Sequence, residues 1–422
     1  MIVYVTRWLG GYQGAGKSAW DALGGILATG RDVHVVAGHA VELPAEVAGH
    51  STHRAQVESL GGRFSSVQRE AISRSRRLIR PLLREPRIAK LLHGVHDRLR
   101  EKIGQKPREV SIPAAPSLIV VNSLGSHDEF LSLDRPHKTP AVLIVRESPG
   151  HYTHRGEESY RRAVQSMTGY DALIFVSNRC RDAWLQESAL REVPAFYVPN
   201  CCEEPEVLAL RASNRTAIRQ SLGFAADRFV AVCVASLQHR KGQDLLVSQL
   251  PRLVARIPHL ELHLVGADSR GFGKELRSMA RQAGLERRLC FHGASDSALA
   301  CLYAADALVL PTRAEAMPRV VLEAMALGTP IVATSVDGIP ELVQHDAGGW
   351  LFAVDRPHEM LEGLSIIAHD QPRAHRWVAE SERRYWAAFS RDLLTRRYAE
   401  LLNNLVDSPS TMTFTHELTR VA

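Results

Sequence analysis

Residues 306–341 read DALVLPTRAEAMPRVVLEAMALGTPIVATSVDGIPE, and their apolar pattern predicts how the second half of the chain folds. Residues 307–310 form a short apolar run of the length of a buried strand, and residues 330–334 form a second one. Between them, residues 318–327 have the composition and length of a helix. A strand, a helix and a second strand in this order predict a βαβ unit of a parallel sheet.

Two residues mark the ends of this helix. Pro318 stands at the first turn, where its missing N–H costs nothing, and Gly328 stands just past the last turn. In an open parallel sheet the loop before such a helix lies in the crevice where ligands bind. Because the free N–H groups and the positive dipole end of the helix lie there, we expect an anionic ligand beside Pro318.

Two glutamates stand eight residues apart in this unit. Glu315 lies in the loop between strand and helix, and Glu323 lies more than one turn into the helix. A carboxylate accepts hydrogen bonds through two oxygens, which suits neighbouring hydroxyls such as those of a ribose. Glutamate is common in helices and this spacing often arises by chance, so the pair indicates a ligand site only together with the two strands around it.

With those strands present, the pattern resembles the retaining glycosyltransferases of family 4, whose signature is Glu-x7-Glu between two such strands. The resemblance implies a nucleotide-sugar donor, with Glu315 contacting the transferred sugar and Glu323 the nucleotide ribose. It also implies that the backbone of four residues contacts the sugar and the diphosphate: Met317, Pro318, Arg319 and Val320. Many relatives have Gly-Phe-Gly in this loop, whereas Pro318 cannot donate an amide hydrogen bond.

A second group of donor residues follows the apolar run 229–235. The next residues read SLQHRKGQDLLV, which matches the family motif Gly-Arg-Leu-x-x-x-Lys-Gly at Lys241. The resemblance implies that Lys241 stabilises the negative charge that the leaving nucleoside diphosphate gains. Ser236 stands where the family has arginine, and a hydroxyl cannot replace a guanidinium at a diphosphate. Either Arg240 or His239 could supply the missing charge.

The remaining site residues come from loops after other predicted strands. The resemblance places the nucleotide base against the backbone of Gly293 and its neighbour, and it places Gly10 and Gly11 in a loop that leans over the cleft. His151 follows the predicted strand 141–148, where relatives often have a histidine close to the donor sugar, although a loop histidine is more often an exposed polar residue. The same strand-end argument places Asn122, Arg146, Glu147 and His154 near the cleft.

Residues 11–18 read GYQGAGKS and therefore also match the phosphate-binding pattern G-x4-G-K-S. This match predicts, as an alternative, an ATP-dependent phosphotransferase that uses Lys17. A phosphate loop follows its strand directly, whereas the predicted strand 2–5 ends several residues before Gly11, and no apolar run ends in an aspartate suited to Mg²⁺. A second alternative is a protein that binds a nucleotide sugar without turnover, which Ser236 alone favours.

The composition is that of an ordinary globular protein with room for two domains. The chain has 422 residues, of which 45% are hydrophobic and 23% charged. No apolar run approaches the roughly 18 residues that cross a bilayer, and the N-terminus lacks a signal-peptide pattern, so we expect a cytoplasmic protein. The six cysteines show no zinc-binding spacing and are expected to be reduced thiols. No Asp-x-Asp triplet suggests a metal–diphosphate site, and no nucleic-acid partner is predicted.

The basic charge is concentrated in one segment. Residues 60–109 contain 14 Lys or Arg against 5 Asp or Glu, and apolar residues recur there at helical spacing between the basic ones. The segment therefore predicts a basic amphipathic helix. Its simpler interpretation is a solvated face packed on its own domain. The alternative is that residues 63–108 contact an anionic membrane at its inner face, as when a sugar is transferred to a lipid-linked acceptor.

These patterns predict an α/β protein with two Rossmann-like, doubly wound domains that face each other across a cleft, the GT-B arrangement of the family it resembles. Residues 1–205 are expected to bind the acceptor and residues 206–380 the donor. Residues 381–405 are expected to form a helix that crosses back to the first domain, and residues 406–422 a disordered tail. The resemblance implies retaining transfer of a sugar to a glycan, lipid-linked or small-molecule hydroxyl, with no cofactor and no metal.

Overall fold

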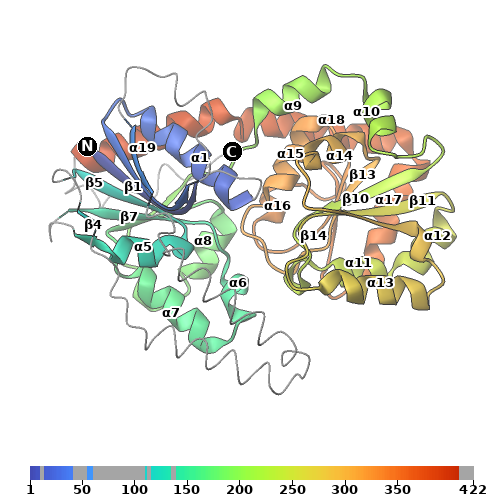
Figure 1. The fold of residues 1–422 in the computed structure, drawn as a ribbon, viewed down its shortest axis with the longest axis horizontal. Helices are drawn as coiled ribbons and strands as arrows, with labels where there is room; N and C mark the ends of the chain where they lie inside the picture. The colour runs from blue at the N-terminus through green and yellow to red at the C-terminus, as the bar shows by residue number, and fades with distance from the viewer. Residues whose placement is uncertain (10–13, 41–54, 60–109, 112–115, 135–138, 408–422) are drawn as a thin grey trace, which may run out of the picture.

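The structure is a computed structural model that describes residues 1–9, 14–40, 55–59, 110–111, 116–134 and 139–407. Two parallel sheets, each with helices against it, lie side by side (Figure 1). We call each large sheet with its helices the N-terminal and the C-terminal domain. The predicted basic segment 63–108, Gly10, Gly11 and residues 408–422 lie outside the described residues.

The N-terminal domain is built on a seven-stranded sheet in the order β3-β2-β1-β5-β7-β8-β9. The strands of its centre are continuous apolar runs, as expected for strands that helices cover on both faces. The strands are β1 (Ile2–Leu9), β2 (Val33–Ala40), β3 (Ala55–Ser59), β5 (Leu118–Asn122), β7 (Ala141–Val145), β8 (Ala172–Phe175) and β9 (Ala195–Tyr197). A separate pair joins β4 (Val110–Ser111) to β6 (Leu133–Asp134).

Short helices connect these strands, and a further helix leads to the second domain. They are α1 (Gly14–Leu27), α5 (His127–Leu131), α6 (Pro149–Thr153), α7 (Glu157–Met167), α8 (Asn178–Trp184) and the connecting helix α9 (Glu204–Arg211). In Figure 1, α6 and α8 lie on the side of the N-terminal domain that faces the C-terminal domain. Residues of these two helices are therefore placed to contact the second domain.

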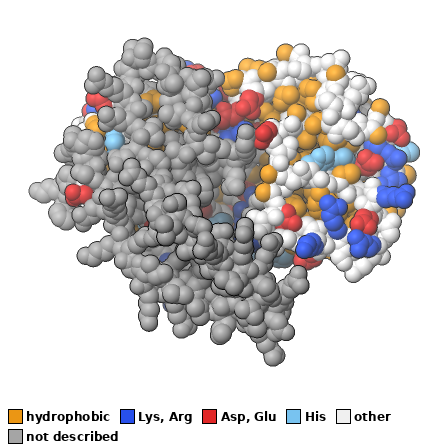
Figure 2. Space-filling view, in the orientation of Figure 1, with side chains coloured by type: hydrophobic (Ala, Val, Ile, Leu, Met, Phe, Trp, Pro, Cys, Tyr) orange, Lys and Arg blue, Asp and Glu red, His pale blue; other side chains and the backbone are white. Residues whose placement is uncertain are grey.

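The C-terminal domain is built on a six-stranded sheet in the order β12-β11-β10-β13-β14-β15. Its strands are β10 (Phe229–Val234), β11 (Leu260–Val265), β12 (Leu289–Gly293), β13 (Ala307–Leu310), β14 (Ile331–Thr334) and β15 (Trp350–Phe352). Its helices are α10 (Arg215–Ser221), α11 (Gln243–Ser248), α12 (Leu250–Arg256), α13 (Phe272–Gln282), α14 (Ala298–Ala304), α15 (Arg319–Leu327), α16 (Ile339–Leu342) and α17 (Met360–His369). Acidic and basic side chains intermingle over the visible face of this domain (Figure 2).

The βαβ unit predicted from residues 306–341 is present as β13, α15 and β14. The helix begins one residue later than expected, because Pro318 has an extended backbone and is the N-cap rather than the first helical residue. Gly328 ends the helix in the left-handed conformation with φ 75°, as its position predicted. Pro318 and Gly328 therefore mark the two ends of α15.

The first strand and helix differ from their predicted bounds. β1 continues through Arg7 to Leu9, and α1 begins at Gly14. The prediction ended the strand with the apolar run at Val5. In the structure the strand continues, and the Arg7 guanidinium pairs with Glu129 at 2.8 Å and Asp128 at 3.1 Å. Ion pairing thus lets a charged residue continue the strand.

Two helices complete the chain. α18 (Gln371–Ala388) packs against α15, and α19 (Arg391–Asp407) packs against α1 of the N-terminal domain. The contact with α1 is close: a Cβ added at Gly25 would lie 2.4 Å from Cβ of Tyr398. The region predicted as one helical stretch is thus two helices with a break before Arg391, and the helix continues to Asp407, into the tail predicted from residue 406.

Two predictions from composition can be compared with the structure. All six cysteines are free thiols, as expected. Among the described residues, no helix is both long and apolar enough to cross a membrane.

Candidate active site

The candidate site lies where the loops of the six-stranded sheet diverge. The chain passes from β10 outward to β11 and β12 on one side, and then returns to β13 on the other side of β10. Loops at the carboxyl ends of β10 and β13 therefore open a crevice, which is where parallel sheets bind ligands. The loop after β10 carries Arg240 and Lys241, and the loop after β13 carries Glu315.

These three side chains meet. The Lys241 ammonium forms an ion pair with Oε2 of Glu315, and Nη1 of Arg240 lies 3.1 Å from the same oxygen. Arg240 also donates to the carbonyl of Ala314 at 2.6 Å. The close approach depends on Gly242, which has φ 71° and whose added Cβ would lie 1.8 Å from the carbonyl oxygen of Pro311.

The charges of this cluster keep Glu315 ionised. Burial alone would raise the pKa of the Glu315 carboxyl, but Lys241 and Arg240 outweigh burial and lower that pKa below its ordinary value. At neutral pH the cluster therefore consists of two cations and one anion. The excess positive charge suits an anionic ligand.

His151 faces this cluster from α6 of the N-terminal domain. Burial, together with the positive charges of Arg240 and others, lowers the pKa of His151 to about 4, so the imidazole is neutral at pH 7. Its neighbour Gly150 packs on the loop of Glu315: a Cβ added to Gly150 would lie 3.1 Å from Cβ of Ala314. The structure thus brings together four of the predicted site residues: Glu315, Lys241, Arg240 and His151.

The structure distinguishes between the two residues that could replace the arginine missing at Ser236. The His239 side chain is 70% exposed and lies 3.8 Å from Asp244, away from Glu315. Arg240 reaches the Glu315 carboxylate. Its guanidinium, rather than His239, therefore supplies a second cation beside Lys241.

Ser236 follows β10 and Gly293 ends β12, with β11 between these two strands in the sheet. Both β11 and β12 lie on the side of β10 away from β13, whose loop carries Glu315. Gly266, after β11, donates its N–H to the carbonyl of Gly293 at 2.7 Å, and a Cβ added to Gly266 would lie 2.9 Å from the N of Ser236. Gly293 is exposed with φ 69°. These residues form a backbone-lined edge of the crevice, and the contact with the nucleotide base that the resemblance implies there stays a prediction.

The residues at the start of α15 contact the N-terminal domain. The carbonyl of Met317 accepts a hydrogen bond from Nδ2 of Asn200 at 3.0 Å. Arg319 is 7% exposed and pairs with Asp21 of α1, which is 3% exposed, and it lies 3.5 Å from Glu203. The Arg319 side chain therefore joins the two domains, which leaves only its backbone for the predicted donor contact. No pattern in the sequence predicted this buried ion pair.

Glu323 and Lys17 face each other from the two domains. Burial raises the pKa of Glu323, and the nearby charges of Arg319 and Lys17 oppose that rise. The Lys17 ammonium also lies 3.6 Å from a carboxylate oxygen of Glu206 on α9. Glu323 and Val320 lie one turn apart on α15, and both are half-buried. They are on the side of the helix that faces this junction.

The phosphate-loop alternative has the wrong geometry. The strand ends at Leu9, so the expected separation between strand and loop was wrong. However, Gly14 and Gly16 are already helical, whereas a phosphate loop must wrap the phosphates with these residues. Lys17 lies in the first turn of that helix and pairs with Glu206.

Two features of the site were not predicted. Arg146 was expected near the cleft, but its role as a junction was not: it donates to Asn122 at 2.7 Å, to Asn200 at 2.5 Å and to the carbonyl of Ser18 at 2.8 Å. Asp337 has φ 45°, and its Oδ2 accepts the N–H of Glu315 at 2.7 Å. Aspartate is one of the few residue types with a side chain that adopt a positive φ, so its presence could have indicated a turn here. It could not have indicated that Glu315 is the hydrogen-bond partner.

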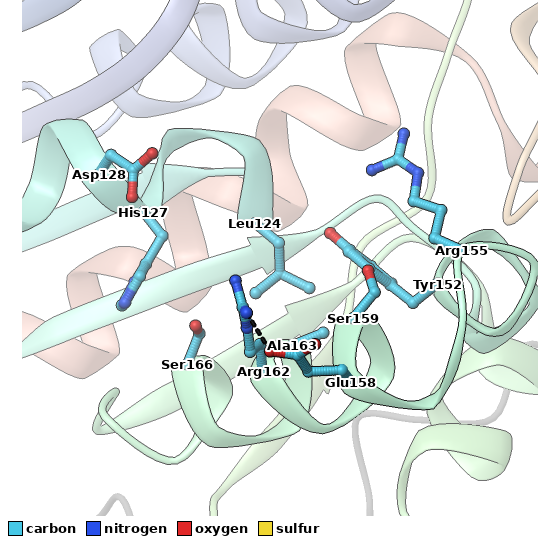
Figure 3. Close-up of a pocket in the computed structure, with 10 residues that line it drawn as sticks. All are labelled: Leu124, His127, Asp128, Tyr152, Arg155, Glu158, Ser159, Arg162, Ala163 and Ser166. Carbon is cyan, nitrogen blue, oxygen red and sulfur yellow. Dashed lines mark hydrogen bonds and ion pairs between the residues drawn. The ribbon is translucent and has the colours of Figure 1, made fainter. Parts of the chain in front are cut away.

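An open cavity of about 520 Å³ lies in the N-terminal domain next to α6 (Figure 3). Tyr152, which follows His151, contributes one of its walls, and α7 and the segment with Leu124, His127 and Asp128 contribute others. The lining residues are Leu124, His127, Asp128, Tyr152, Arg155, Glu158, Ser159, Arg162, Ala163 and Ser166. No group of three or more His, Cys, Asp and Glu side chains in the described part of the chain could hold a metal ion.

Residues 214–384 match the family described as glycosyl transferases group 1. These residues lie within the C-terminal domain of this chain. The resemblance predicted from Glu315, Glu323 and Lys241 is therefore confirmed at the level of the family. This match covers the site described above, from the strand that precedes Lys241 to the helix that follows β15.

Curated relatives match over part of the chain. A D-inositol 3-phosphate glycosyltransferase of Actinosynnema mirum is 36% identical over 170 residues, which are 37% of this chain and 39% of the relative. A GDP-mannose-dependent α-(1-6)-phosphatidylinositol monomannoside mannosyltransferase of Mycobacterium tuberculosis is 32% identical over 188 residues, 42% of this chain and 48% of the relative. The chain thus matches less than half the length of either relative.

Solved structures match nearly the whole chain. HepE of Anabaena, in complex with UDP and glucose, superposes with a TM-score of 0.69 at 21% identity over 96% of this chain and 99% of that one. WaaG, a glycosyltransferase involved in lipopolysaccharide biosynthesis, superposes with a TM-score of 0.65 at 16% identity over 95% of this chain and 99% of that one. The predicted GT-B fold is therefore confirmed.

Proposed function

We propose that this protein is a retaining glycosyltransferase that moves a sugar from a nucleoside-diphosphate sugar to an acceptor hydroxyl. The observation that carries the proposal is the meeting of Lys241, Arg240 and Glu315 at the carboxyl ends of β10 and β13. A diphosphate needs cationic groups and a sugar needs hydrogen-bond acceptors, and this crevice offers both. The group 1 family match over the same residues supports the proposal.

Lys241 and Arg240 would stabilise the leaving group. As the glycosidic bond breaks, the nucleoside diphosphate gains negative charge, and cations already placed beside it lower the barrier. The acceptor oxygen then bonds to the anomeric carbon on the face from which the diphosphate departs, and its proton passes to the leaving phosphate. The two side chains supply the neutralising charge themselves.

Glu315 is proposed to position the sugar rather than to attack it. In retaining hydrolases a carboxylate acts as a nucleophile and forms a covalent intermediate. Here the Glu315 carboxylate is engaged by two cations, which lower its pKa and reduce its nucleophilicity. A carboxylate held in this way can accept hydrogen bonds from sugar hydroxyls. Neutral His151, opposite it, can exchange hydrogen bonds with the same sugar.

The donor is proposed to be a hexose linked to UDP or GDP. HepE was solved with UDP-glucose, and the mycobacterial relative is named for GDP-mannose. A panel of UDP-, GDP- and ADP-sugars tests this directly, with donor hydrolysis and the shift of the unfolding temperature as readouts. A donor raises the unfolding temperature of the native protein only if it binds. If none of these sugars is hydrolysed and none stabilises the protein, the proposed function is wrong.

The cavity beside α6 is proposed to receive a carbohydrate part of the acceptor. Its lining offers an aromatic ring, two serines and charged groups of both signs, a set that suits a neutral polyhydroxyl ligand. Ser159→Trp should raise the acceptor KM about tenfold or more and leave donor hydrolysis unchanged. Gln165→Trp, on the same helix but outside the lining, is the matched control. An unchanged acceptor KM in Ser159→Trp would place the acceptor elsewhere.

The acceptor is proposed to be a glycan or a lipid-linked glycan, met at the cytoplasmic face of a membrane. The basic composition of residues 63–108 supports weak binding to anionic lipid. Sedimentation with vesicles containing anionic lipid at low salt should retain the protein, and added salt should release it. Equal retention on neutral vesicles would contradict this part of the proposal.

A further inference from the structure

The turn that follows β14 contacts the loop that carries Glu315, and it also contacts the N-terminal domain. Asp337 adopts φ 45° in this turn, in the left-handed region that residues with a side chain seldom adopt. Its Oδ2 accepts the N–H of Glu315 at 2.7 Å. Its own carbonyl accepts a hydrogen bond from Nε of Arg179, on α8 of the N-terminal domain, at 2.9 Å. One residue therefore links Glu315 to the opposite domain.

The next residue, Gly338, is packed too closely on its neighbours to carry a side chain. A Cβ added to Gly338 would lie 1.8 Å from the carbonyl oxygen of Ala316 and 2.7 Å from Oγ of Ser177. The first atom belongs to the loop of Glu315 and the second to the N-terminal domain. The turn is therefore packed between the two.

Glu341 fixes the far end of the turn to the same helix. Its carboxylate accepts hydrogen bonds from Oγ of Ser177 at 2.6 Å, from N of Asn178 at 3.0 Å and from N of Arg179 at 2.6 Å. Three donors on one carboxylate, with charge-assisted bonds, make a firm contact between domains. Residues 337–341 thus hold the start of α8 from one side and the Glu315 backbone from the other.

We propose that Asp337 is a positioning residue through which the contact between the two domains sets the backbone of Glu315. When α8 is docked, Arg179 and Glu341 hold the turn, and the turn presents the Asp337 carboxylate to the Glu315 amide. When that docking is lost, Asp337 relaxes to an ordinary backbone conformation and the amide loses its acceptor. The inference rests on the proposed function for its consequence in turnover, but not for its consequence in structure.

Amide hydrogen exchange tests the structural link without any substrate. Arg179→Ala removes a side chain of the N-terminal domain that does not touch Glu315, and it should raise the exchange rate of the peptide containing Glu315 about tenfold. Arg161→Ala, which removes an exposed arginine of α7 paired with Glu157, is the matched control and should leave that rate unchanged. Unchanged exchange at the Glu315 peptide in Arg179→Ala would overturn the proposal.

Two substitutions at Asp337 then separate the hydrogen bond from the backbone strain. Asp337→Gly keeps the left-handed backbone but removes the acceptor, so kcat should fall about tenfold with little change in donor KM. Asp337→Asn keeps an oxygen acceptor and tolerates the same backbone, so it should stay within about threefold of wild type. If Asp337→Gly has wild-type kcat, or if Asp337→Asn loses as much as the glycine variant, Asp337 does not act as proposed.

The double variant tests whether both residues act through one contact. If they do, Arg179→Ala together with Asp337→Gly should reduce kcat little more than Asp337→Gly alone, because the second change finds the link already broken. If the reductions in kcat of the two single variants multiply in the double variant, the two residues do not act through one contact. Failure of the proposed function gives a different result: wild-type protein would then hydrolyse no sugar nucleotide, while the exchange difference at Glu315 would still decide the coupling.

Discussion

The ammonium of Lys241 and the carboxylate of Glu315 form an ion pair although the two residues lie 74 positions apart in the sequence. Each stands on a loop at the carboxyl end of a central strand, β10 for Lys241 and β13 for Glu315. These strands are neighbours in the sheet, so the pair forms at the point where the chain changes direction across it. The chemistry of the site follows from this adjacency.

Lys241→Ala and Glu315→Ala should each lower turnover by about 10²-fold or more. The first removes a cation that stabilises the leaving diphosphate, and the second removes the acceptor that orients the sugar. Steady-state turnover with the best donor of the panel measures both. Lys274→Ala, on an exposed lysine of α13, is the control for a lost lysine charge and should keep wild-type turnover. Near wild-type transfer by both site variants would remove these roles.

Gly242→Ala should damage the site and the fold, whereas Gly284→Ala should do little. Both glycines have a left-handed backbone, with φ of 71° and 69°, so an added methyl costs each about 1–2 kcal/mol of strain. At Gly242 the methyl also meets the Pro311 carbonyl, while at Gly284 it meets open space. Urea unfolding should therefore show a larger loss for Gly242→Ala, accompanied by lost turnover. Equal losses in the two variants would mean that the clash is relieved without cost.

Arg319→Met should destabilise the protein by about 3–5 kcal/mol, because it leaves the buried carboxylate of Asp21 without its cation. Asp21→Leu should also be destabilising, since the buried Arg319 guanidinium then loses its closest partner and keeps Glu203, at 3.5 Å, and the nearby charge of Glu323. The double variant, with an apolar pair in the same place, should be more stable than either single variant. Urea unfolding curves of the three variants measure this. A double variant less stable than both would contradict it.

Acid should destabilise the protein partly through His263. Its Nδ1 lies 2.9 Å from Nε2 of His292, it is 3% exposed, and burial followed by the charges of His292 and Arg219 lowers its pKa to about 4. The unfolded chain binds a proton near pH 6.5, so between pH 6.5 and 4 the unfolded state holds more protons than the folded one. The free energy of unfolding should therefore decrease as the pH is lowered from 6.5 to 4.

The loss should approach about 1.4 kcal/mol per pH unit for this histidine. Glu261 lies 3.6 Å from the other ring nitrogen of His263 and 3.4 Å from Nε of Arg228. His263→Gln should show a shallower decline in the free energy of unfolding between pH 6.5 and 4, while His151 continues to contribute in both proteins. A variant that declines as steeply as wild type would show that His263 takes up its proton in the folded state.

The sequence predicted the sheets and the core of the site for physical reasons. Central parallel strands must be apolar on both faces, so runs such as those of β5 and β13 are visible without a structure. Glu315 and Lys241 could be found because each lies in the loop after such a strand and matches a motif of the family that the chain resembles. Strand ends and loop glycines are local signals, and local signals can be found in a sequence.

Contacts between the domains could not be predicted. The charge pattern does not distinguish Arg319, which is buried against Asp21, from the many exposed arginines of the chain. Glu341 reads as an ordinary helix residue, although its partners are the N–H groups at the start of α8. The conformation of Asp337 depends on Arg179, which lies on the other domain. Each of these residues is defined by a partner more than 150 positions away, and no local signal records it.

The packing of Tyr398 against Gly25 has a consequence for how the chain is made. A ribosome releases α1 early, but the helix that covers its outer face emerges some 370 residues later, as the pairing of Arg31 with Asn403 and Asp407 illustrates. Until then the apolar surface shared by these two helices is open to water. The N-terminal domain is synthesised first, but it therefore completes its packing only after α19 has been synthesised.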